Sequence, residues 1–66
     1  MQIIVNGSCL EVDSGFTLLA LLDHMGKPSA HVAVEHNGEI VERNDFSSVT
    51  LDDKDRLEIV HFVGGG

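Results

Sequence analysis

The alternation of apolar and polar residues at the start of the chain predicts a β-hairpin. Two apolar-rich runs, residues 1–5 and 8–12, flank Asn6-Gly7, a dipeptide that favours the positive φ angles of a tight two-residue turn. With that turn, six residues lie on one side in three facing pairs: Met1 with Val12, Ile3 with Leu10, and Val5 with Ser8. The other side holds Gln2, Ile4, Cys9 and Glu11. The apolar residues gather mainly on one side, as a half-buried hairpin requires.

A leucine-rich stretch after this hairpin predicts one short helix. Its apolar residues recur at helical spacing and form a single stripe: Leu18, Leu21, Leu22 and Met25. Thr17 is a suitable N-cap and Gly26 a suitable C-terminal stop. Pro28 prevents the helix from continuing. We expect the stripe to belong to the core, packed on a sheet.

A second Asn-Gly dipeptide, at residues 37 and 38, predicts a second hairpin. The strand before it alternates between its two sides, with Val32 and Val34 against Ala33 and Glu35. On the returning strand, Ile40 or Val41 continues the apolar pattern.

The rest of the chain predicts an irregular segment and a final strand. Three apolar residues are expected to close one end of the core from a short turn or 3₁₀ helix: Phe46, Val49 and Leu51. The acidic run 52–55 is expected to be a polar turn. In the final strand, four residues are expected on one side and three on the other: Leu57, Ile59, His61 and Val63 against Glu58, Val60 and Phe62.

This order of elements predicts an α+β fold in which one main helix packs on one face of a mixed sheet of four to five strands. The first and last strands can pair in parallel at the centre, because the connection between them is long and contains the helix. That arrangement is the ubiquitin-like β-grasp. We expect residues 1–63 to form the domain and residues 64–66 to form a flexible glycine tail that leaves from the central strand.

The composition limits the classes of function. With 66 residues the chain makes one domain, and a hydrophobic content of 42% is enough for one core. Eleven Asp and Glu against four Lys and Arg give a net charge of −7. We therefore expect no binding to nucleic acid or to an anionic membrane, both of which require a cationic surface. An acidic surface suits docking on basic patches of protein partners.

Other features of the sequence favour a cytoplasmic protein. The first residues resemble no secretory signal, and no apolar run approaches the length of a membrane span. The single cysteine, Cys9, cannot form an internal disulfide, which fits a reducing compartment.

Cysteine and histidine chemistry is poorly supported. Cys9 is a candidate nucleophile, but no neighbouring residue supplies a base, so we expect it to act as a small hydrophobic residue. The histidines are candidate metal ligands: His24, His31, His36 and His61. None pairs at helical ligand spacing, and we expect His31 and His36 on opposite faces of one strand, so we predict no metal site. One cysteine is too few for an iron–sulfur cluster.

The candidate functional residues are the three glycines that end the sequence, Gly64, Gly65 and Gly66. Three extended residues beyond Val63 reach roughly 10 Å, and without Cβ atoms they can enter a channel too narrow for a side chain. The alternative is a frayed end of no consequence. We interpret the tail as functional because it follows an apolar strand with no polar linker.

On this interpretation the terminal carboxylate is the reactive group. Its ordinary pKa is about 3.5, so it is ionised at neutral pH, and it is a poor acyl donor until it is activated, most simply as an acyl-adenylate made from ATP. Attack by an amine would then produce a conjugated protein tag. Attack by a persulfide, followed by reduction, would produce a thiocarboxylate and make the protein a sulfur donor. The residues alone leave both outcomes open.

Four stretches of the chain resemble the sulfur carrier proteins of thiamine biosynthesis: "MQIIVNG", "FTLLALL", "VAVEHNGEIVER" and "DRLEIVHFVGGG". The resemblance covers essentially the whole chain. A Gly-Gly end is shared with ubiquitin and with the small subunit of molybdopterin synthase, so it indicates only the class. The ending "EIVHFVGGG" together with "VxxNGEIVxR" is more specific to the thiamine carriers.

The resemblance implies a carrier without an active site of its own and without a bound cofactor. An adenylating enzyme related to ubiquitin activators would use ATP to activate the Gly66 carboxylate. A cysteine desulfurase system would supply sulfur as a persulfide, and thiazole synthase would receive it from the Gly66 thiocarboxylate. Gly65 would allow passage through the channels of these partners, and Gly64 would add reach. The molybdopterin synthase subunit and a protein-conjugating modifier remain the alternatives.

Partner recognition is expected on the last strand. Val60 and Phe62 fall on the side opposite Leu57 and Ile59, so they should face solvent or a partner. With the adjoining Val63 they form a candidate docking patch beside the tail. The alternative is that another segment of the chain covers them.

Overall fold

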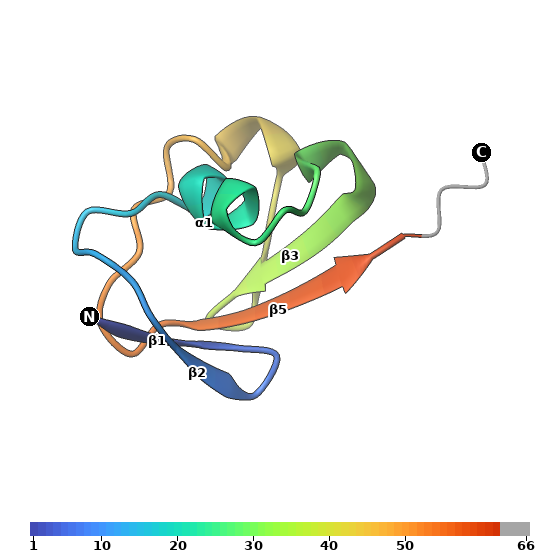
Figure 1. Ribbon diagram of the computed structural model, residues 1–66. Coiled ribbons are helices and arrows are strands. Elements are labelled where there is room, and N and C mark those ends of the chain that lie inside the picture. Colours follow the sequence, from blue (N-terminus) through green and yellow to red (C-terminus); the bar gives the residue numbers. More distant parts are fainter. Residues whose placement is uncertain (63–66) are drawn as a thin grey trace.

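The computed structural model describes residues 1–62, which form one five-stranded sheet with a helix across one face (Figure 1). The strand order is β2-β1-β5-β3-β4. The strands are β1 (Gln2–Val5), β2 (Ser8–Glu11), β3 (Val32–His36), β4 (Glu39–Val41) and β5 (Arg56–His61). The helix is α1 (Leu18–His24), and two 3₁₀ helices are η1 (Ser29–His31) and η2 (Arg43–Asp45). The α+β β-grasp prediction is confirmed, whereas the predicted boundary between 1–63 and 64–66 lies outside the described residues.

The first and last strands meet in the centre of the sheet, as the sequence predicts. β1 and β5 pair in parallel, with Ile4 opposite Arg56 and Val5 opposite Leu57. The amide of Asn6 donates to the Leu57 carbonyl at 2.9 Å. On its other side β5 pairs antiparallel with β3. The strand that leads to the C-terminus is therefore held along both of its edges.

The first hairpin has the predicted turn and register. Asn6 and Gly7 both adopt positive φ, at 50° and 84°, as a tight turn that matches the twist of the strands requires. Ile3 lies opposite Leu10, and Val5 lies opposite Ser8. A shift of one residue would have moved every apolar side chain to the solvent side.

The helix begins and ends for the predicted reasons. The Thr17 hydroxyl accepts a hydrogen bond from the Ala20 amide at 3.1 Å, which caps the N-terminus. At the other end Gly26 has a φ of +69°. The amides of Gly26 and Lys27 donate back to the carbonyls of Asp23 and Leu22, at 3.1 and 2.9 Å, which is a Schellman motif.

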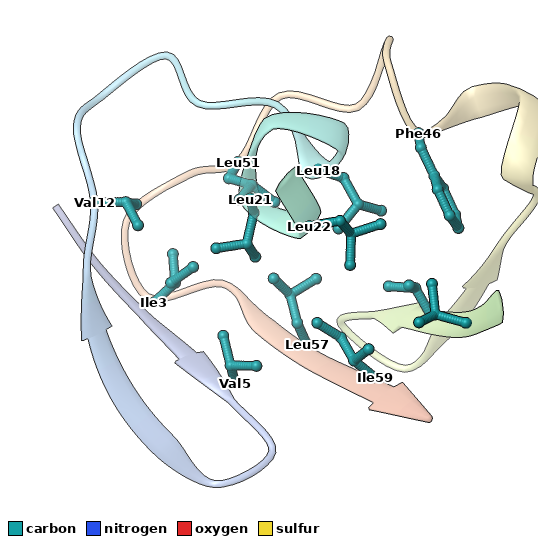
Figure 2. Close-up of a cluster of buried hydrophobic side chains, with 12 residues drawn as sticks. Ile3, Val5, Val12, Leu18, Leu21, Leu22, Phe46, Leu51, Leu57 and Ile59 are labelled. Carbon is teal, nitrogen blue, oxygen red and sulfur yellow. The ribbon is translucent and has the colours of Figure 1, made fainter. Parts of the chain in front are cut away.

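The core fills the space between α1 and the sheet (Figure 2). Three leucines of α1 are fully buried above the inward side chains of the strands: Leu18, Leu21 and Leu22. Phe46 and Leu51 are buried and Val49 packs against the core, so the expectation that these three residues contribute to the core is confirmed. Each such buried side chain contributes about 1.5–3 kcal/mol of transfer free energy. Within residues 1–62, no helix has the length and apolar character needed to cross a bilayer.

Candidate functional site

The outward side of β5 exposes apolar side chains, as predicted. Val60 is 59% exposed and Phe62 is 50% exposed, whereas Leu57 and Ile59 face the core. No other described segment covers Val60 and Phe62, so the alternative that a further segment of the chain packs over them is wrong for residues 1–62. Val63, the third residue of the predicted docking patch, lies outside the described residues.

Hydrogen bonds position this side of β5 up to its last described residue. The amide of Phe62 donates to the His31 carbonyl at 2.7 Å. The side chain of Asn6 accepts from the Ile59 amide at 2.7 Å and donates to the Ile59 carbonyl at 3.1 Å. The strand that precedes the glycines is therefore hydrogen-bonded to its neighbours up to Phe62, and Val60 and Phe62 are exposed on it.

The exposed apolar surface extends beyond β5 to the neighbouring strands. Ala33 of β3 lies directly opposite Val60. Ile40 of β4, the next strand along, is 70% exposed, whereas Val41 packs against the core. The sequence left open which of Ile40 and Val41 continues the apolar pattern, and the structure assigns Val41 to the core.

The end of β5 farthest from the glycines is organised by a residue that the sequence interpretation missed. Residues 52–55 were expected to form a simple polar turn, yet Asp55 is buried. Its carboxylate accepts from the Asp52 amide at 2.8 Å and from Asn37 Nδ2 at 3.1 Å. It also lies 2.7 Å from His36 Nε2. The predicted turn is confirmed, but Asp55 is not a plain surface residue of that turn, because its side chain joins the turn to the second hairpin.

These contacts also determine the pKa of Asp55. Burial disfavours the charged form and acts to raise the pKa, but hydrogen bonds from the Asp52 amide, His36 and Asn37, together with the charge on His36, outweigh it. The pKa of Asp55 therefore lies below its ordinary value of 3.8. The ionised carboxylate is the form that stabilises the fold.

The depressed pKa of Asp55 predicts a loss of stability in acid. The contribution of Asp55 is complete at pH values above its ordinary pKa of 3.8 and is lost as the pH falls through the lower pKa of the folded state. We expect the difference in free energy of unfolding between wild type and Asp55→Asn to narrow as the pH falls below about 4. Urea denaturation of both proteins between pH 7 and pH 2.5 measures this difference. If the free energy of unfolding of the two proteins changed in parallel with pH over the whole range, the lowered pKa of Asp55 would be contradicted.

The histidines and Cys9 do not form a metal site in the described part of the chain. His31 belongs to η1, ahead of β3, so the expectation that His31 and His36 share one strand is wrong. Instead the rings of His31 and His61 lie edge to face, with centroids 6.5 Å apart. His61 is exposed, although it was expected on the core side. Cys9 is also exposed, and residues 1–62 contain no cluster of three or more candidate ligands.

The predicted reactive group, the carboxylate of Gly66, and its neighbours Gly64 and Gly65 lie outside the described residues. No pocket opens among residues 1–62. The site that can be described is therefore the rigid end of β5 and the exposed surface around Val60 and Phe62.

Comparison with known proteins places this arrangement in one family. A sequence model described as the ThiS family matches residues 3–66. The crystal structure of a thiamine biosynthesis protein (ThiS) from Geobacter metallireducens superposes with a TM-score of 0.84 at 36% identity, and each chain is covered completely. The sulfur carrier protein ThiS of Bacillus subtilis is 54% identical over 35 residues, which are 53% of each chain.

Some relatives are much longer proteins. A thiazole synthase of Paramagnetospirillum magneticum is 42% identical over all 66 residues of this chain. The chain spans 20% of the length of that protein and of a second thiazole synthase that it matches. In these relatives the matching region and the remaining four-fifths are parts of one polypeptide.

Proposed function

This chain belongs to the ThiS family, and on that basis we propose that it is a sulfur carrier for the synthesis of the thiazole of thiamine. The observation that supports this most strongly is the family match, which runs from residue 3 to residue 66 and so includes all three final glycines. The Gly66 carboxylate is the group that accepts sulfur and then donates it. The protein acts as a co-substrate and contributes no catalytic group of its own.

The chemistry follows from the weakness of a carboxylate as an acyl donor. A partner enzyme transfers AMP from ATP to the Gly66 carboxylate and releases pyrophosphate, so that AMP becomes the leaving group of the next step. The terminal sulfur of a persulfide attacks the acyl carbon and AMP departs. A thiol then reduces the sulfur–sulfur bond and releases the Gly66 thiocarboxylate. Gly65 and Gly64 add length without side chains, so the acyl group can enter a narrow channel.

The protein partners are proposed from the similarity to thiazole synthases and from the requirements of the chemistry. Thiazole synthase is the acceptor of sulfur, because two thiazole synthases contain a region similar to this chain within the same polypeptide. The chemistry requires an adenylating enzyme, which binds the ATP, and a cysteine desulfurase system as the source of persulfide. The carrier itself binds no cofactor, nucleic acid or membrane. We place it in the cytoplasm, where its exposed free Cys9 remains reduced.

Mass spectrometry of the chain tests this function directly. The protein is incubated with the adenylating enzyme, ATP, cysteine and the desulfurase, and the C-terminal peptide is then analysed. We expect one oxygen at Gly66 to be replaced by sulfur, and the loaded protein to support thiazole formation by thiazole synthase. Amide adducts on lysines of other proteins would instead identify a modifier. Rescue of a molybdopterin-deficient strain, but not of a thiazole-requiring strain, would identify the other carrier.

We further propose that Val60, Phe62 and Val63 form the docking patch for the adenylating enzyme, and Phe62→Asp tests it. The substitution places a charge on an exposed apolar contact, so we expect the affinity to fall at least ~30-fold, the size of an interface hot spot. The melting temperature should change by only a few degrees, because Phe62 is 50% exposed. Titration calorimetry and thermal unfolding measure the two effects.

Leu19→Asp is the matched control, because Leu19 is also a partly exposed apolar residue but lies on α1, away from β5. It should leave the affinity within about twofold of wild type. Equal affinities for wild type and Phe62→Asp would remove Phe62 from the docking patch.

A further inference from the structure

Two glutamates face each other on the outer side of the sheet, and neither forms an ion pair within residues 1–62, although Arg56 lies on the same face two residues before Glu58. Glu35 of β3 and Glu58 of β5 are directly opposite in the antiparallel register. Both are exposed. No Lys or Arg nitrogen of residues 1–62 lies within 4.0 Å of either carboxylate. Two like charges directly opposite in a sheet destabilise it.

Apolar side chains border this carboxylate pair on two sides. Ile40 of β4 lies opposite Glu35 on its far side and is 70% exposed. Along β5, Val60 and then Phe62 follow Glu58 on the same face and lead toward the C-terminus. Figure 1 shows β3 and β5 side by side below α1, with their other face free of any described element. The outer face therefore combines two unpaired carboxylates with three large exposed apolar residues.

We infer that this surface, formed by Glu35, Glu58, Ile40, Val60 and Phe62, docks on thiazole synthase around one of its arginines. The guanidinium lies between the two carboxylates, and its neighbours on the enzyme cover the apolar side chains. This inference rests on the proposed function and adds the chemical nature of the contact. The destabilising pair in the free carrier becomes an attractive triad once the partner supplies a positive charge.

Charge and geometry favour an arginine over a lysine as the partner residue. A planar guanidinium can hydrogen-bond two carboxylates at once and can pack its faces on apolar groups, which a lysine ammonium does less well. The carrier has a net charge of −7, so a cationic patch on the enzyme would also speed association. Thiazole synthase is the chosen occupant because two relatives of that name contain a region similar to this whole chain within one polypeptide.

The double variant Glu35→Gln/Glu58→Gln tests the inference. It preserves the size of both side chains and removes both charges. We expect its affinity for thiazole synthase from the same organism to fall at least ~30-fold at low salt, as when one partner of a desolvated charge pair is removed. The salt dependence of binding should also flatten. The melting temperature of the free variant should rise by roughly 2–5 °C, because the opposed charges are gone.

A matched control removes two charges elsewhere. Glu39 and Asp13 are exposed and make no side-chain hydrogen bond or ion pair in residues 1–62, and neither lies on the outer side of β3 or β5. Glu39→Gln/Asp13→Asn should keep the affinity within about threefold of wild type. An equal loss of affinity for thiazole synthase in both double variants would show that the effect depends only on net charge, and would overturn the inference.

Three further outcomes would also overturn the inference. One is unchanged binding of the Glu35→Gln/Glu58→Gln variant to thiazole synthase. Another is a fall in its melting temperature, which would give the pair a structural role. The third is a loss of binding to the adenylating enzyme alone, which would assign the surface to that partner. The proposed function is judged separately, by whether wild-type Gly66 acquires sulfur, so the two failures are distinguishable.

Discussion

Deleting Gly66 is expected to abolish formation of the thiocarboxylate and to leave the domain folded. The deletion still leaves a terminal glycine, but it draws the carboxylate back by one residue, roughly 3.5 Å. A displacement of about 1 Å at a reacting group can cost a hundredfold in rate, so this shift removes the acyl carbon from the adenylation site. The measurement is the fraction of chains with sulfur at the C-terminus after loading.

The fold should not respond to this deletion. The core residues described within residues 1–62 all lie between Ile3 and Ile59. Deleting Gly66 therefore removes none of that packing. We expect the melting temperature to stay within about 1 °C of wild type. Gly65→Ala is the length-matched comparison, since it keeps the reach and adds only a Cβ; we expect it to slow loading without abolishing it. A truncated chain that loads normally, or one that no longer folds, would contradict the carrier assignment of Gly66.

Much of the fold could be predicted from the sequence because its signals are local. Asn6-Gly7 determines a turn by its backbone preferences, and the turn then determines which side chains face the core. Thr17 and Gly26 mark the ends of α1 in the same way. The parallel pairing of the first and last strands follows from the long connection between them, which topology permits in few ways. Each of these predictions uses residues close together in sequence, or a rule that holds for any chain.

The exposed surface could be predicted only in part, because its chemistry depends on register between distant strands. Alternation alone indicates that Val60 and Phe62 face outward. It does not indicate that Glu58 lies opposite Glu35, since that requires the alignment of β3 with β5. The same limit applies to Ile40, because either register of a three-residue strand is compatible with its pattern. The facing pair of like charges can be recognised only when the register between the two strands is known.

His61 illustrates a different limit. Its position in the alternation places it on the core side of β5, with Leu57 and Ile59, yet it is exposed. Near its C-terminal end β5 continues away from α1 (Figure 1), so the core side of the strand is no longer covered there. Periodicity predicts which way a side chain points but not whether another element lies above it.

Asp55→Ala is expected to be the most destabilising single substitution of a charged residue in the described chain. Three groups lose their partner at once: the Asp52 amide, His36 and Asn37. Leaving such groups unsatisfied costs about 3 kcal/mol in free energy of unfolding. For a domain of this size that is a large share of the total stability and corresponds to a fall in melting temperature of roughly 12–24 °C. Thermal unfolding followed by circular dichroism measures it.

The reason for so large an effect is the position of Asp55 at the start of the central strand. The Asp55 carbonyl accepts from the Ile4 amide at 2.8 Å, and the Arg56 amide donates to Asn37 Oδ1 at 2.9 Å. Asp55 therefore lies where β5 meets β1 and the second hairpin: its backbone bonds to β1 and its side chain bonds to the second hairpin. Asp52→Ala is the matched control, because Asp52 is exposed and its carboxylate makes no hydrogen bond in residues 1–62. We expect this control to change the stability by less than about 0.5 kcal/mol. Asp55 lies at the opposite end of β5 from the glycines. The Asp55→Ala protein should therefore still accept sulfur at a temperature where it is folded. Failure to accept sulfur at such a temperature would show that Asp55 affects the reactive end of the chain as well as stability.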